Sequence, residues 1–77
     1  MNHEHLRPVP GIYRHYKGQS YEVIGLAQHS ETEEPLVVYR ALYGDYGLWV
    51  RPLGMFSETV EVQGEPLPRF ELEVAFK

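Results

Sequence analysis

The sequence predicts a small all-β domain, built as an antiparallel barrel or roll of five to six short strands. From residue 11 onward, short segments rich in β-branched and aromatic residues alternate with glycine and proline. Few windows carry the periodicity of a helix. With 77 residues, the chain has room for one domain and is shorter than most β-sandwiches. A single barrel or roll accommodates all of these observations.

Residues 1–10 predict an extended or frayed lead-in, because they are mostly polar and include two prolines that favour extended backbone. The single β domain then covers residues 11–77. Its first strand is expected over residues 12–16. It ends before Gly18, a residue that suits a tight turn.

The second strand is expected over residues 21–28, and Gly25 inside it indicates a bulge or a sharp bend. Residues 29–35 are polar and predict a loop, which can hold one helical turn capped by Ser30. The third strand, residues 36–42, is almost continuously apolar. That pattern is typical of a central strand covered on both faces.

Residues 43–47 combine two glycines with an aspartate, and they predict a hairpin connection to a fourth strand over residues 48–51. The fourth strand stops at a proline, which lacks a backbone donor. After it, a short turn is expected to present Met55 and Phe56 to the core.

The C-terminal third predicts a fifth strand over residues 59–62, a loop over residues 63–68 and a last strand over residues 69–76. Apolar residues occupy every second position of the last strand, so we expect it to be half-buried with a solvated acidic face. Strands about ten residues apart favour an SH3-like barrel. An OB-fold is the alternative, although it usually needs a longer chain.

The composition restricts the classes of protein that the chain can represent. It has no cysteine, which excludes a thiol nucleophile or a thiolate metal site, and a formal net charge of −4, which opposes nonspecific binding to nucleic acid or anionic membrane. The N-terminal residues lack a signal-peptide pattern, and no apolar run approaches the length of a membrane helix. These absences predict a cytoplasmic protein.

Six stretches of the sequence form an ordered series of motifs: residues 11–18 (GIYRHYKG), 21–32 (YEVIGLAQHSET), 38–44 (VYRALYG), 48–52 (LWVRP), 55–56 (MF) and 68–70 (PRF). Together they resemble a bacterial family, domain of unknown function 1653. This resemblance spans nearly the whole predicted domain. The resemblance implies an SH3-type β-roll of bacterial origin and leaves the activity open, because the family has no assigned catalytic residues.

The histidines His15 and His29 are the first candidates for chemistry, with Glu31 or Glu33 as a second partner. Their spacing matches no known ligand motif, and the hydroxyl residues lie in no nucleophile elbow. We therefore expect both imidazoles to bond backbone groups at strand ends or in loops. The sequence predicts no metal and no cofactor.

Arg40 interrupts the apolar third strand, and a charge in that position needs a partner. The alternation of a strand places Arg40 on one face and Tyr39 on the other. Two interpretations remain open at this point. Arg40 pairs with an internal carboxylate such as Glu22, or it anchors an anionic group of a ligand.

Aromatic residues gather around the predicted strand ends and the hairpin of residues 43–47. In SH3-like barrels, such residues form shallow grooves for proline-rich, methylated-lysine or terminal peptide segments. The alternative is that Trp49 plugs one end of the barrel and the tyrosines cover its rim. Together with the residues above, the candidate ligand-binding set is His15, His29, Arg40, Tyr43, Tyr46 and Trp49.

These patterns favour a noncatalytic recognition module that binds a peptide or a partner protein. Its surface is expected to be the hairpin of residues 43–49, with the loop of residues 29–34 beside it. A nucleic-acid-binding barrel is the first alternative, since tyrosine and arginine can stack on and clamp a strand. A small enzyme that uses histidine and glutamate is the second, and the sequence does not decide the oligomeric state.

Overall fold

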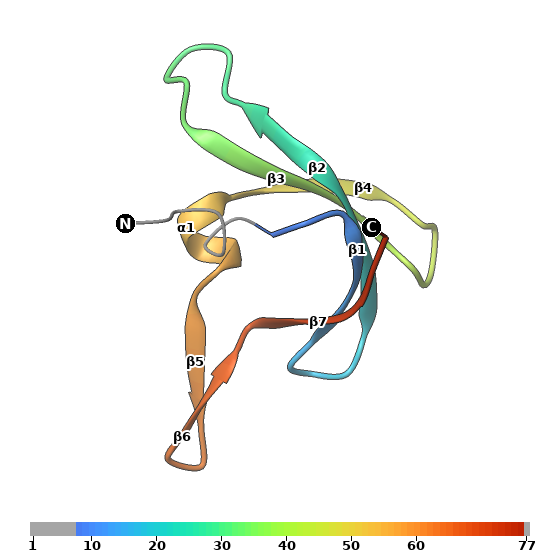
Figure 1. Ribbon diagram of the computed structural model, residues 1–77, viewed down its shortest axis with the longest axis vertical. Coiled ribbons are helices and arrows are strands. Elements are labelled where there is room, and N and C mark those ends of the chain that lie inside the picture. The colour runs from blue at the N-terminus through green and yellow to red at the C-terminus, as the bar shows by residue number, and fades with distance from the viewer. Residues whose placement is uncertain (1–7, 77) are drawn as a thin grey trace.

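The protein is described by a computed structural model for residues 8–76, and these residues form an all-β domain (Figure 1). A curved antiparallel sheet has the spatial order β4-β3-β2-β1-β7, and a separate hairpin joins β5 to β6. The elements are β1 (Gly11–His15), β2 (Ser20–Gln28), β3 (Pro35–Ala41), β4 (Leu48–Pro52), α1 (Leu53–Phe56), β5 (Thr59–Val62), β6 (Glu65–Pro68) and β7 (Phe70–Ala75). The last strand lies beside the first, and one helical turn follows β4, as expected for an SH3-like roll. The predicted fold class is therefore confirmed.

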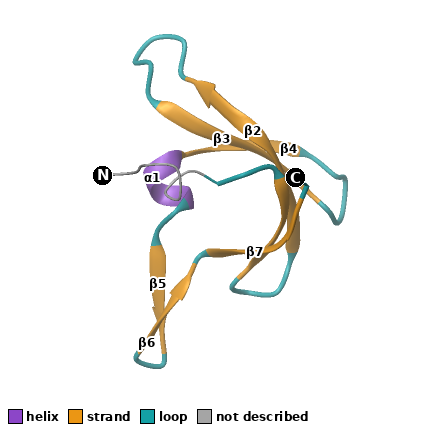
Figure 2. Ribbon diagram, viewed as in Figure 1, coloured by secondary structure: helices purple, strands orange, loops and turns teal. Residues whose placement is uncertain are grey.

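Figure 2 shows how little of the described chain is helical. No helix in residues 8–76 has the length and apolar character needed to cross a membrane. Most of the predicted lead-in, residues 1–7, lies outside the described residues, and residues 8–10 contain no helix or strand. The backbone carbonyl of Val9 accepts a hydrogen bond of 2.8 Å from the Tyr13 hydroxyl, which ties the start of the described chain to β1.

The structure has more strands than the five or six predicted, because residues 63–68 are not simply a loop. Gln63 and Gly64 both have positive φ, 52° and 82°, which is the geometry of a two-residue hairpin turn. The chain then pairs as β6 with β5. Pro66 and Pro68 fit this strand because a two-stranded hairpin leaves one edge without ladder hydrogen bonds.

The third strand has one buried face, so the prediction that both faces are covered is wrong. Val37, Tyr39 and Ala41 are buried, whereas Val38 and Arg40 between them are partly exposed. The other elements pack against only the concave side of the curved sheet. The opposite side meets solvent. The predicted alternation of the strand is correct, and only the second covering layer is missing.

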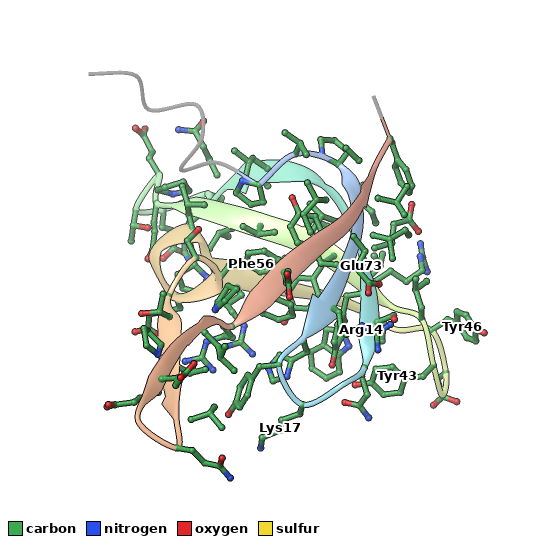
Figure 3. All side chains as sticks on the ribbon, turned by 60° about the horizontal axis from the view of Figure 1, so that its bottom comes forward. Arg14, Lys17, Tyr43, Tyr46, Phe56 and Glu73 are labelled. Carbon is green, nitrogen blue, oxygen red and sulfur yellow. The ribbon has the colours of Figure 1, made fainter. Side chains whose placement is uncertain are left out.

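The core is formed largely by aromatic rings. Phe56 of α1 stacks on Phe70 of β7 with ring centroids 4.2 Å apart and an interplanar angle of 2°. Figure 3 shows Phe56 inside the fold, whereas Met55 is exposed, so only one half of the expectation for this turn is correct. Leu53 packs against the core instead. The remaining buried residues of this cluster are Tyr13, Val23, Val37 and Tyr39.

Irregularities in pairing shape two strands. The pairing of β2 with β3 shifts between Val23 and Gly25, which confirms the predicted bulge. A second shift in β1–β7 leaves Glu73 as the extra residue, because Tyr13 pairs with Leu72 and Ile12 with Val74. Across that bulge, residues two apart no longer share a face.

The last strand is therefore not half-buried along its length, as its sequence pattern predicted. Within β7, Phe70 is buried while Leu72 and Val74 are exposed. The extra residue Glu73 reaches Arg14 of β1, with a Nε–Oε2 distance of 2.7 Å, and Figure 3 shows these two side chains next to each other. The acidic residues of this strand are solvated, as expected, but the apolar ones are solvated as well.

Candidate functional site

Four aromatic side chains and one arginine line an open pocket of about 200 Å³ at one end of the sheet. They come from three neighbouring strands and the loop of residues 42–47. Tyr39 and Trp49 are directly paired across β3 and β4, so they share a face of the sheet. Arg51 is two residues beyond Trp49 and lies on the same face. The lining residues are Tyr21, Tyr39, Tyr43, Trp49 and Arg51.

Tyr21 is the central ring of this end of the molecule. Its ring centroid lies 5.5 Å from that of Tyr39, 5.5 Å from that of Tyr43 and 5.4 Å from that of Phe70, each in an edge-on arrangement. Rings in such contacts attract one another through their quadrupoles as well as by burial. The aromatic wall of the pocket is thus continuous with the core.

A hydrogen bond between two phenols fixes the rim of the pocket. The hydroxyl oxygens of Tyr21 and Tyr43 are 2.7 Å apart. Burial, and then this bond to Tyr43, raise the pKa of Tyr21 to about 12. Tyr21 is therefore a neutral phenol at physiological pH, and the exposed Tyr43 ring is held against it.

Arg51 is the cation of the pocket. Its Nε donates a hydrogen bond of 3.3 Å to the Tyr39 hydroxyl, and its guanidinium carbon lies 5.8 Å from the centroid of Phe70. Neither of the two ion pairs in residues 8–76 involves Arg51, since they join Arg14 to Glu73 and Arg69 to Glu58. The guanidinium is positioned by rings and not by a carboxylate.

His15 lies beside this wall, since it pairs with Phe70 across β1 and β7 and its ring is 4.9 Å from the Phe70 ring. Its Nδ1 accepts the backbone N–H of Lys17 at 3.2 Å, as expected for a histidine at a strand end. Burial, followed by the positive charges of Arg69, Arg51 and Lys17, lowers the pKa of His15. His15 is therefore a neutral acceptor in a positively charged neighbourhood.

Of the six predicted site residues, the structure brings Tyr43 and Trp49 together in the lining of the pocket, and His15 lies beside it in ring contact with Tyr21. Tyr46 belongs to the same loop as Tyr43 but does not line the pocket. Its ring is exposed, its backbone has a positive φ of 57°, and Figure 3 shows it projecting away from the fold.

Arg40 lies on the opposite face of the sheet from the pocket, because it alternates with the buried Tyr39. It stands opposite Glu22 in the strand pairing, yet its guanidinium donates to the Tyr46 carbonyl at 3.1 Å. The proposed ion pair with Glu22 is therefore not observed. The backbone of the loop, and not a carboxylate, is the observed partner of the arginine.

His29 lies at the far end of the β2–β3 pair, so the expectation that the loop of residues 29–34 lies beside the hairpin is wrong (Figure 1). Two antiparallel strands place their connecting loop at one end and the next connection at the other. The Nδ1 atom of His29 accepts the backbone N–H of Glu31 at 3.1 Å, so the predicted backbone role is confirmed. The His29 imidazole and the Thr32 hydroxyl, which accepts the backbone N–H of Glu34 at 3.2 Å, organise this turn, and the predicted cap from Ser30 is not observed among the described residues.

The candidate set omitted Tyr21, Tyr39 and Arg51, although the pocket depends on them. Period-two alternation from Trp49 identifies Arg51 directly, because i and i+2 share a face of a strand. Tyr21 and Tyr39 require the register of three strands, which no local pattern supplies.

A second open pocket, of about 480 Å³, lies at the His29 end of the sheet. It is larger, but its lining contains one carboxylate and neither aromatic rings nor a cation. The lining residues are Leu26, Ala27, Gln28, Glu33 and Pro35. In residues 8–76, no three histidine or acidic side chains gather as a metal site would require.

The architecture defines a small all-β domain of the SH3-like type with an aromatic pocket at one end of its sheet. The model of the DUF1653 family, described as proteins of unknown function, matches residues 11–72, and the chain belongs to that family. A crystal structure of a DUF1653 protein from Bordetella bronchiseptica is similar, with 43% sequence identity and a TM-score of 0.79. The match covers 88% of this chain and 90% of that one. Comparison with curated proteins gave no match.

Proposed function

We propose that the domain is a recognition module that binds a peptide segment of a partner protein in the aromatic pocket. The observation that carries this proposal is the lining itself, in which four aromatic side chains and an arginine meet at an open surface. Aromatic residues and arginine are enriched at the centres of protein interfaces, because they bury much area and still form directed polar contacts.

Trp49 supports the proposal through its unusual exposure. It is 59% exposed although it is the only tryptophan of the chain and lines the pocket. A tryptophan that plugged the barrel would be buried, as the alternative interpretation required. An exposed indole that lines a pocket together with three tyrosines is a ready contact for an apolar side chain of a ligand.

The enzyme alternative loses its geometric basis in this arrangement. His15 and His29 lie at opposite ends of the sheet, so they cannot act on one substrate. Each uses its Nδ1 atom to accept a backbone N–H. A binding role for the domain needs neither histidine as a proton carrier.

The test uses Trp49 as the reporter. We expect a pool of random short peptides to change the fluorescence of this single tryptophan and to shift the NMR signals of the residues that line the pocket. The Trp49→Ala substitution should weaken binding about tenfold or more, since it removes a central aromatic contact. NMR shifts confined to the His29 end would contradict the proposal.

Val50→Ala is the matched control for this substitution. Val50 is the next residue of the same strand, is 58% exposed and points to the opposite face of the sheet. We expect its truncation to leave peptide binding unchanged. Equal loss of binding in both variants would place the contact surface elsewhere.

A further inference from the structure

The aromatic pocket contains a cation without an internal counter-ion. Arg51 lines it, and of the three nitrogens of its guanidinium only Nε donates a hydrogen bond to a group within residues 8–76. Arg14 and Arg69, by contrast, each contact a glutamate. The two terminal nitrogens of Arg51 are therefore free to donate, in the fork geometry that matches a carboxylate.

The phenols that surround Arg51 add donors and no formal negative charge. The Tyr39 oxygen accepts from Arg51, which leaves its own hydrogen free to donate. Tyr21 and Tyr43 share one hydrogen bond, so one of these two hydroxyls also retains a hydrogen for an external acceptor. The raised pKa of Tyr21 keeps its phenol protonated.

The charges that act on His15, beside the pocket, are positive, although the whole chain has a net charge of −4. Arg69, Arg51 and Lys17 all act on His15 in the same direction, and no carboxylate opposes them there. Glu58 compensates one of these cations through its contact of 2.8 Å with Arg69. Arg51 and Lys17 leave a local excess of positive charge.

We propose that the pocket binds an anionic peptide group, a carboxylate of the C-terminus or of an Asp or Glu side chain, on the free nitrogens of Arg51. An apolar side chain of the same peptide then packs on Trp49. A methylated lysine is rejected, because its charge repels Arg51 and the free donors offer it no acceptor. This inference rests on the proposed peptide-binding function and specifies its ligand.

The experiment measures the binding of matched pools of acetylated, amidated pentapeptides to the full chain. Binding is followed by NMR and by the fluorescence of Trp49. Their central residue is Glu, Gln, Lys or trimethyl-lysine, and all other positions are uncharged. We expect the Glu pool to bind about tenfold more tightly than the Gln pool, because only Glu can form a charge-assisted bidentate contact with Arg51. That preference should diminish as salt is added. The Gln pool with a free C-terminal carboxylate tells whether a chain terminus serves equally well.

Arg51→Gln should abolish the preference for Glu over Gln, while Arg40→Gln, on the opposite face of the neighbouring strand, should preserve it. Arg51→Lys keeps the charge without the fork and should retain part of the preference. If Arg51→Gln does not fold, the charge series and its salt dependence on the natural chain still decide the question.

The outcomes separate this inference from the proposed function. Binding at Trp49 with equal affinity for the Glu, Gln and Lys pools would overturn the inference and leave peptide recognition standing. No response of Trp49 to any pool would contradict both. Tighter binding of a random single-stranded RNA pool than of the Glu pool, at the same salt, would overturn the assignment to a peptide.

Discussion

The two ends of the β2–β3 pair share one local feature, a turn with a histidine that accepts a backbone N–H, but their surroundings differ. At each end, a histidine Nδ1 accepts the backbone N–H two residues later, from Lys17 at one end and Glu31 at the other. Only the His15 end adds packed aromatic rings and an arginine. The His29 end has the larger pocket but a polar and aliphatic lining. Chemistry, and not volume, distinguishes the candidate site.

The largest expected effect on stability comes from removing the Phe56 ring, which lies beneath the aromatic end of the sheet. Phe56→Ala deletes the partner stacked on Phe70, and we expect it to lower the free energy of unfolding by about 3–5 kcal/mol. Leu26→Ala at the other end removes a partly exposed side chain and should cost well under that amount. Urea denaturation of both variants measures the contrast. Similar losses would show that the two ends contribute equally to stability.

A smaller loss of stability is expected from a substitution in β1 where it pairs with β7, the strand that supplies Phe70. A Cβ at Gly11 would collide with the Val74 carbonyl oxygen, so Gly11→Ala must displace the paired strand. We expect a destabilisation of about 1–3 kcal/mol, the typical cost of overpacking. Gly54→Ala is the control, since nothing lies within 4 Å of its Cβ position and its φ is not positive. Thermal melts that were the same for both variants would contradict this account of the junction.

A further difference between the two ends is the hydrogen-bonded phenol pair at the rim of the aromatic pocket. Tyr43→Phe removes the 2.7 Å hydrogen bond to Tyr21 and should lower the free energy of unfolding by about 0.5–1 kcal/mol. It should also lower the pKa of Tyr21, which NMR can follow during an alkaline titration. Tyr46→Phe, in the same loop but with its ring directed away from the fold, should change neither quantity. If the titration of Tyr21 were unaltered in Tyr43→Phe, the hydrogen bond between the Tyr21 and Tyr43 hydroxyls would be contradicted.

The smallest expected effect is a pH dependence that originates at His15. Its pKa in the folded chain is below the ordinary 6.5, so the unfolded chain takes up the proton first as the pH falls. Its contribution to stability is complete above pH 6.5 and decreases as the pH falls from 6.5 through the folded pKa. Unfolding of His15→Asn, measured across this range, should depend less on pH than unfolding of the natural chain. An equally steep dependence would exclude His15 as its source.

Most of the strand content could be predicted from sequence, because glycine, proline and alternating apolar residues act locally. The alternation of Tyr39 and Arg40 correctly assigned them to opposite faces, and Gly25 correctly marked a bulge. Pro66 and Pro68 suggested a loop, since their tolerance in a hairpin depends on which edge is left free.

The candidate site was predicted less completely, because it is assembled by register. Tyr43 and Trp49 were found from their place beside a turn, whereas Tyr21 reaches the pocket only through the pairing of three strands. His29 was wrongly grouped with them, although antiparallel connectivity alone places its loop at the opposite end. Apolar alternation in β7 was misleading, because the Glu73 bulge depends on the partner strand.

That same bulge changes the outer edge of the larger sheet. Among the described residues, β7 is an outer strand of the larger sheet, and Leu72 and Val74 on it are exposed. A regular outer strand with such side chains would template addition of another chain, whereas a bulge breaks the even row of backbone donors and acceptors. Glu73, fixed to Arg14, also places a charged pair at this edge. We therefore expect the irregular pairing to hinder strand-by-strand aggregation at this edge.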